Sequence, residues 1–161
     1  MTDSNAVSLT PGQKAPAFTL TSDENKPVSL TDYAGQRILI FFYPKAGTPG
    51  CTIQACGFRD AFPKIHEVNA TVLGISPDSA ADLAGWRSQE QLPYTLLSDA
   101  DHKVAEAYGA WGERSMYGKA YMGIIRSHFV IGPDGTLEDV QINVSPKDSI
   151  NKGVEALLNR S

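Results

Sequence analysis

One stretch constrains this chain more than any other, because it contains both of its cysteines. Cys51 and Cys56 are five residues apart and follow an apolar run from Ile38 to Tyr43. Pro44 ends that run, since proline cannot continue a central strand. The loop that follows is rich in Gly and Pro, and beyond it apolar residues recur mostly every three or four positions, which is typical of a helix. The pattern predicts that Cys51 lies in the first turn of a helix, at the carboxyl end of a buried strand.

A cysteine in that position has a distinctive chemistry. The N-terminus of a helix carries about half a positive charge and several unpaired N–H groups, and both favour a thiolate over a thiol. The thiolate is the nucleophile, and a second cysteine five residues later could attack the first once it has been oxidised. Free cysteines are often small buried hydrophobic residues instead, but the loop, the helix start and the spacing favour a reactive pair.

The residues around the cysteines also resemble a known family. Pro44-x-x-x-Thr48-x-x-Cys51 matches the active-site signature of peroxiredoxins. The run Gly-Cys-Thr-x-x-Ala-Cys-Gly-Phe-Arg-Asp at 50–60 is similar to the bacterioferritin comigratory protein (PrxQ) subfamily. A second stretch agrees, with Trp-Gly-Glu at 111–113, Met-Tyr-Gly-Lys at 116–119, Tyr-Met-Gly-Ile at 121–124 and then Arg126. The resemblance extends from Gly12 to the last helix.

This resemblance implies a thiol-dependent peroxidase that reduces hydrogen peroxide and organic hydroperoxides in antioxidant defence. Cys51 would attack the peroxide and become a sulfenic acid. Cys56 would be the resolving cysteine, which condenses with that sulfenic acid to an intramolecular disulfide, as in an atypical 2-Cys peroxiredoxin. A thioredoxin or glutaredoxin-like protein would reduce the disulfide. The subfamily suggests a monomer, and we expect no cofactor.

Two further side chains are candidates for the same site. The Thr48 hydroxyl could accept a hydrogen bond from the thiol or donate one to a peroxide oxygen, although a loop hydroxyl commonly bonds the backbone instead. By itself Arg126 would be interpreted as part of a surface salt bridge, since most arginines are solvated. Its match to the Gly-x-x-Arg pattern of the family, with Gly123, implies that the guanidinium faces the thiolate and the peroxide.

The backbone and the residues next to the cysteine complete the expected site. Pro44 is expected to shield the thiolate from water, and the N–H groups of Gly50 and Cys51 are expected to point at the bound oxygens. Gln54 stands where the subfamily often has Glu, so a role that needs a carboxylate there is not available to this chain.

Composition and charge limit the other possibilities. The chain has 161 residues and a net charge of −4, with no basic cluster, so neither nucleic acid nor an anionic membrane is an expected partner. Its longest apolar run is far too short to span a bilayer. The polar N-terminus is followed by no apolar segment, so we expect no signal peptide and a cytoplasmic location. The three histidines have no metal-ligand spacing, and we interpret them as structural or solvated, with no metal site; they are His66, His102 and His128.

The rest of the chain predicts alternating strands and helices. An N-terminal hairpin is expected at 18–21 and 26–30, followed by a short helical turn at 30–33. Further strands are expected at 38–43, 71–76, 95–97, 127–131 and 137–142, and helices from Cys51, at 79–91, at 103–108 and from Pro146. This order predicts an α/β thioredoxin-like fold with a mixed central sheet flanked by helices. We expect one domain over 1–161, with residues 1 to about 14 as a loose tail.

Two segments carry weaker signals. Residues 109–125 show no clear periodicity, and we interpret them as a packed loop rich in Gly and aromatic residues. Pro63 falls inside the helical pattern that follows Cys51, so the helix is expected to end or kink near Phe62.

Two other functions are compatible with a cysteine pair. A thiol–disulfide oxidoreductase that acts on protein disulfides would carry C-x-x-C, whereas this chain has C-x-x-x-x-C. A non-enzymatic domain could use the pair as a structural bridge or a redox sensor, but closing a loop of about six residues stabilises by only about 2 kcal/mol. On one regular helix the two Cα atoms would be roughly 8.6 Å apart, and a disulfide needs them within about 7 Å. Disulfide formation therefore requires the helix to unwind.

Overall fold

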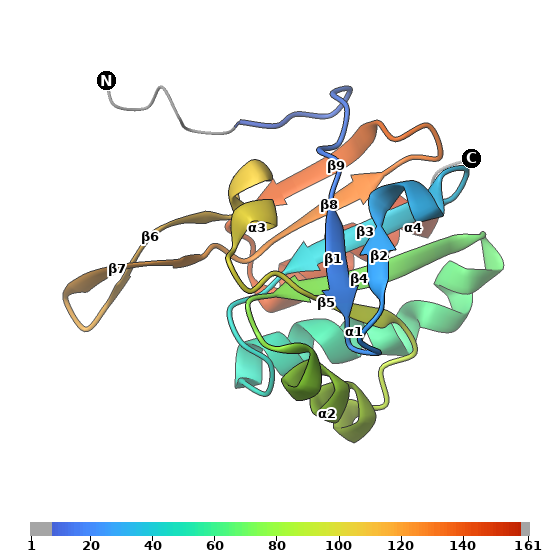
Figure 1. Ribbon diagram of the computed structural model, residues 1–161. Coiled ribbons are helices and arrows are strands. Elements are labelled where there is room, and N and C mark those ends of the chain that lie inside the picture. Colours follow the sequence, from blue (N-terminus) through green and yellow to red (C-terminus); the bar gives the residue numbers. More distant parts are fainter. Residues whose placement is uncertain (1–7, 159–161) are drawn as a thin grey trace.

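The computed structural model describes residues 8–158 and is built around a seven-stranded mixed sheet, with a separate two-stranded hairpin (Figure 1). The strand order in the sheet is β2-β1-β5-β4-β3-β8-β9. Strands β3, β4 and β5 are parallel to one another, and the other neighbours pair antiparallel. The strands are β1 (Thr19–Ser22), β2 (Pro27–Ser29), β3 (Arg37–Phe42), β4 (Ala70–Ser76), β5 (Thr95–Ser98), β8 (Ser127–Ile131) and β9 (Leu137–Ile142).

Strand β3 lies in the interior of the sheet and divides the core into two layers, because successive side chains of a strand point to opposite faces. Leu39 and Phe41 belong to one cluster, which they share with α1, α2 and α4. Ile38, Ile40 and Phe42 belong to a second cluster on the other face, which includes α3. An unbroken apolar run was the signal for a strand buried on both faces, and this prediction is confirmed.

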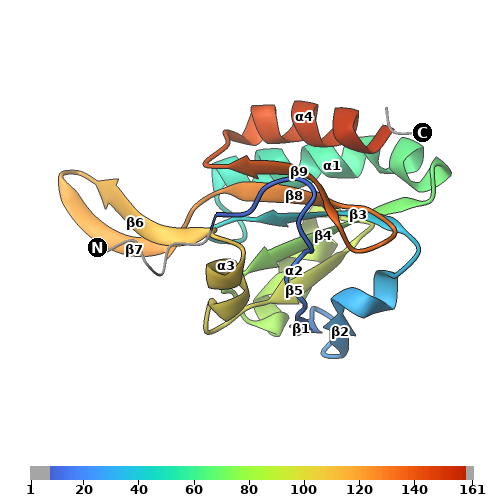
Figure 2. The same ribbon diagram turned by 90° about the horizontal axis from the view of Figure 1, so that it is seen from above.

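Within residues 8–158, four helices and one 3₁₀ turn accompany the sheet. They are α1 (Pro49–Glu67), α2 (Ala80–Glu90), α3 (Lys103–Ala107), α4 (Pro146–Leu158) and the turn η2 (Leu30–Tyr33). Figure 2 shows α1 and α4 side by side on one face of the sheet. The Ser79 hydroxyl accepts from the backbone N–H of Asp82, and so caps α2 as the sequence predicts.

Helix α1 does not end at Phe62. It continues through Pro63 to Glu67, so the expected end is wrong, while the alternative of a kink near Phe62 stays a prediction. Proline removes one backbone hydrogen bond from a helix interior, but the last turn of α1 is anchored by Ile65, which is completely buried in the core. The burial of that side chain offsets the missing bond, since a fully buried Ile contributes about 1.5–3 kcal/mol.

The segment expected to be a packed loop is a β-hairpin instead. Strands β6 (Trp111–Met116) and β7 (Lys119–Ile124) pair antiparallel and extend away from the body of the molecule (Figure 1). Tyr117 and Gly118 connect them, both with positive φ, which is the backbone of a two-residue hairpin turn. Because most of the hairpin lies outside the core, its residues need no alternation of apolar and polar side chains, and periodicity could not reveal it.

Part of the N-terminal segment is held by the sheet rather than loose. The N–H of Gly12 donates to the carbonyl of Leu137 at 2.8 Å, and the N–H of Leu137 donates to Gln13 at 2.8 Å. The N–H of Ala15 donates to Gly135 at 2.9 Å. The expectation of a loose tail is therefore wrong for residues 12–14, and its first seven residues lie outside the described part. Within residues 8–158 no helix is long and apolar enough to cross a membrane.

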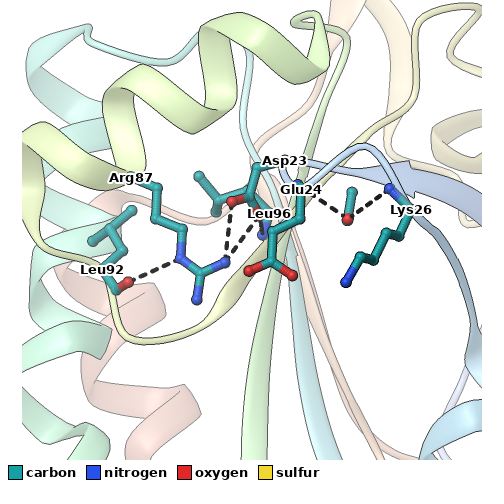
Figure 3. Close-up of polar contacts among 7 residues, drawn as sticks. Asp23, Glu24, Lys26, Arg87, Leu92 and Leu96 are labelled. Carbon is teal, nitrogen blue, oxygen red and sulfur yellow. Dashed lines mark hydrogen bonds and ion pairs between the residues drawn. The ribbon is translucent and has the colours of Figure 1, made fainter.

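A polar clamp holds α2 against the N-terminal hairpin. Arg87 lies 3.1 Å from both carboxylate oxygens of Asp23 and donates through Nε to the carbonyl of Leu92 at 3.1 Å (Figure 3). Asp23 also accepts from the backbone N–H of Leu96 at 3.0 Å. The Asp23 side chain is only 6% exposed, so solvent screens this ion pair less than an exposed one. The clamp fixes the end of α2, where Glu90 lies.

Candidate active site

Cys51 lies at the position that the sequence predicts, in the first turn of α1. Thr48 is the N-cap residue, Pro49 opens the helix, and Cys51 is its third residue. The loop that leads to it is tied to β4, because the Asp78 carboxylate accepts from the N–H of Ala46 at 2.8 Å and from the Ser76 hydroxyl at 2.7 Å. Cys51 is completely buried, and both cysteines are free.

Arg126 reaches Cys51 from the segment between β7 and β8. Its Nη2 lies 3.5 Å from the Cys51 sulfur, and its Nη1 donates to Oε1 of Gln54 at 2.8 Å. A Cβ added to Gly50 would lie 3.0 Å from Nη2, so glycine leaves room for the guanidinium. The sulfur therefore faces a positive charge as well as the positive end of a helix dipole, and both favour negative charge at this point.

Thr48 and Pro44 are the other two side chains predicted for the site. The Thr48 hydroxyl donates to the carbonyl of Lys45 at 2.8 Å, which is the backbone bond considered as the alternative. Its hydrogen is therefore engaged, while its oxygen keeps lone pairs that can accept a hydrogen bond. Pro44 follows the end of β3 and is exposed.

Cys56 lies further along α1 in a different environment. Its thiol donates to Oε1 of Glu90 at 3.4 Å, and Arg59 donates to the carbonyl of Glu90 at 2.8 Å. Burial raises the pKa of the Cys56 thiol, the hydrogen bond to the Glu90 carboxylate raises it further, and the charge of Arg59 opposes both. The reduced structure thus favours a neutral thiol at Cys56. Next to it, the Tyr94 hydroxyl donates to the carbonyl of Ala55 at 2.6 Å.

A row of buried polar side chains behind Arg126 was not identified from the sequence. Gln54 donates through Nε2 to the Ser149 hydroxyl at 2.8 Å. Ser149 also lies 2.8 Å from Nδ1 of His128, and Nε2 of that histidine lies 3.1 Å from Asp139. Of the two interpretations of His128, the structural one is confirmed and the solvated one is wrong. The available signal was a polar residue on an otherwise apolar face, at Gln54 in α1, at Ser149 in α4 and at His128 in β8.

The surface beside the site is hollowed. An open groove of about 430 Å³ lies between the loop at 45–47 and α2, with Asp78, Asp82 and Trp86 in its lining. A cavity of about 220 Å³ lies at the other end of β3, between Ile38 and Ile131, away from the cysteines. Among residues 8–158, no group of three or more His, Cys, Asp or Glu side chains is arranged to hold a metal ion.

Several known proteins are similar to this chain in sequence. The model of the AhpC/TSA family matches residues 11–140. The peroxiredoxin Bcp of Escherichia coli strain K12 is 49% identical over 132 residues, which cover 82% of this chain and 85% of the relative. The peroxiredoxin Bcp of Bacillus subtilis strain 168 is 41% identical over 150 residues, which cover 93% of this chain and 96% of the relative.

A solved structure extends the comparison to the fold. The bacterioferritin comigratory protein of Xanthomonas campestris, described for its alkyl peroxide reduction activity, superposes with a TM-score of 0.84 at 28% identity. The match covers 92% of this chain and 97% of that chain. The predicted thioredoxin-like fold is thereby confirmed. The chain therefore belongs to the AhpC/TSA family of thiol-dependent peroxidases, as a peroxiredoxin of the bacterioferritin comigratory protein (PrxQ) group.

Proposed function

We propose that this peroxiredoxin reduces hydrogen peroxide and organic hydroperoxides through Cys51, forms an intramolecular disulfide with Cys56, and is recycled by a thioredoxin or glutaredoxin-like protein. One observation carries the assignment of Cys51. Its buried sulfur lies at the N-terminus of α1 and 3.5 Å from the Arg126 guanidinium. The alkyl peroxide reduction described for the Xanthomonas campestris protein supports peroxides as the substrate class.

In the first step the Cys51 thiolate attacks one peroxide oxygen. A sulfur–oxygen bond forms and the O–O bond breaks, and the second oxygen takes the proton of the attacked oxygen and leaves as water or an alcohol. The Cys51 sulfenate then takes up one proton from water and becomes a sulfenic acid. Negative charge moves from sulfur to the leaving oxygen during this step. Arg126 and the N–H groups of Gly50 and Cys51 stabilise that charge, and the free lone pairs of Thr48 accept from the peroxide O–H. Pro44 limits the access of water.

In the second step the thiol of Cys56 attacks the Cys51 sulfenic acid. A disulfide forms, and the hydroxyl of the sulfenic acid leaves with the thiol proton as water. Both cysteines lie on the unbroken helix α1, so its first turns must unwind before the sulfurs can meet. Unwinding also separates Cys56 from Glu90 and exposes the disulfide to a dithiol protein, which reduces it by exchange.

The burial of Cys51 argues against the alternative of a thiol–disulfide oxidoreductase. Its sulfur has no exposed surface in the reduced fold, so the disulfide of another protein cannot approach it. A small peroxide needs only a small movement of the side chains that cover the sulfur. The expectations of a cytoplasmic location and of a monomer stay predictions.

The proposal is tested by following NADPH oxidation in the presence of hydrogen peroxide, thioredoxin reductase and thioredoxin, with a glutaredoxin system in parallel. We expect turnover with the natural chain and none with Cys51→Ser. Cys56→Ser should consume about one equivalent of peroxide and then stop, with sulfenic acid on Cys51 detected by mass spectrometry. Normal cycling of Cys51→Ser would refute the proposed role of that residue. Normal cycling of Cys56→Ser would show that resolution uses another thiol.

A further inference from the structure

An unbroken row of hydrogen bonds connects Arg126 to a carboxylate on β9. It runs from Arg126 through Gln54 of α1, Ser149 of α4 and His128 of β8 to Asp139 of β9, with contacts of 2.8, 2.8, 2.8 and 3.1 Å. The three middle residues are completely buried. Buried polar groups need partners, and a row in which every member has two is a rigid support.

The groups at the two ends of the row determine which atoms donate and which accept in the hydrogen bonds between them. A guanidinium can only donate hydrogen bonds, and a carboxylate can only accept them. Gln54 must therefore turn its oxygen toward Arg126 and its NH₂ toward Ser149. At the other end, a neutral His128 that donates through Nε2 to Asp139 has Nδ1 as the acceptor for the Ser149 hydroxyl. Every hydrogen bond then points in the same direction, from the cation to the carboxylate.

We propose that Ser149 and His128 are positioning residues for the reaction of Cys51, and this inference rests on the peroxidase function proposed above. They hold the Gln54 amide in the one orientation that presents an acceptor to Arg126. Without Ser149 the buried NH₂ of Gln54 has no acceptor, so the amide would shift toward another acceptor and draw its oxygen away from the guanidinium. Arg126 would then lose the contact that holds it against the sulfur.

The test measures the second-order rate constant for the reaction of reduced protein with hydrogen peroxide, without any recycling system. We expect Ser149→Ala and His128→Phe each to lower this constant about tenfold, the effect of losing one hydrogen bond to a charged group. His128→Asn should recover part of the loss, because its amide oxygen can take the place of Nδ1 as the acceptor for Ser149. Ser22→Ala is the matched control, since Ser22 is a buried serine that accepts from Glu24 and Lys26 in the N-terminal hairpin.

A double-mutant cycle separates positioning from general damage to the fold. In an Arg126→Met background, Ser149→Ala should have no further effect on the rate constant, because the residue through which it acts is already lost. A wild-type rate in Ser149→Ala, or an equal loss in both backgrounds, would overturn the inference. Failure of the proposed function itself is distinguishable, because it would appear as peroxide consumption by Cys51→Ser.

Discussion

We expect Arg126→Met to slow the reaction of Cys51 with peroxide about a hundredfold while the fold survives. The guanidinium lies 3.5 Å from the sulfur, and two unit charges at that separation interact by about 4.7 kcal/mol at an effective dielectric constant of about 20. Arg126 is partly exposed, so water screens part of this energy. If about 2.7 kcal/mol of the interaction remains after screening, its loss slows the reaction about a hundredfold. This is within the range found when one preorganised donor is removed.

The measurement is a single-turnover reaction of reduced protein with increasing hydrogen peroxide, quenched at intervals and assayed for free thiols. Arg114→Met is the matched control, because Arg114 lies on the β6–β7 hairpin and contacts Asn143 instead of the cysteine. It should react like the natural chain. If Arg126→Met also reacts within about twofold of the natural chain, the guanidinium contributes nothing to the transition state and the electrostatic argument fails.

Three further predictions concern the helix that carries both cysteines. Glu90→Gln removes a group that raises the pKa of Cys56, so in a Cys51→Ser background iodoacetamide should alkylate Cys56 faster at neutral pH; an unchanged or lower rate would contradict this. Gly57→Ala places a Cβ in steric conflict with Cδ1 of Ile150 and should lower the free energy of unfolding in urea by about 1–3 kcal/mol. That loss should shrink in an Ile150→Ala background, and full additivity would exclude the steric cause. Amide exchange at 51–58 should be faster in the disulfide form than in the reduced form, and strong protection in both would rule out unwinding.

The sequence determines the surroundings of Cys51 through local patterns. The apolar run before Pro44, the loop and the helical spacing after Cys51 each act over a few residues, so strand, loop and helix could all be placed correctly. The β6–β7 hairpin was not predicted, because most of it lies outside the core and only burial imposes a periodic pattern on a strand. Its turn at Tyr117 and Gly118 was a local signal of a kind that periodicity does not measure.

The row of buried polar side chains behind Arg126 could not be predicted from local patterns. Gln54 and Ser149 are 95 residues apart in the chain, and only the packing of α1 against α4 brings them together. Similarly, the path of the loop determines that the Thr48 hydroxyl donates to the carbonyl of Lys45. Pair contacts of this kind follow from tertiary structure, so one sequence can indicate a buried polar residue without naming its partner.

The complete burial of Cys51 has a consequence for turnover. In the proposed mechanism a protein reductant engages the Cys51–Cys56 disulfide only while the helix is open, and it has no disulfide to reduce once both thiols return to the folded helix. The reduced peroxidase should therefore be a poor competitor for the reductant, even when it is in large excess over the oxidised form. The reduced peroxidase would then inhibit the reductant only weakly. The rate at which the reductant is consumed would depend on the supply of peroxide rather than on the amount of enzyme.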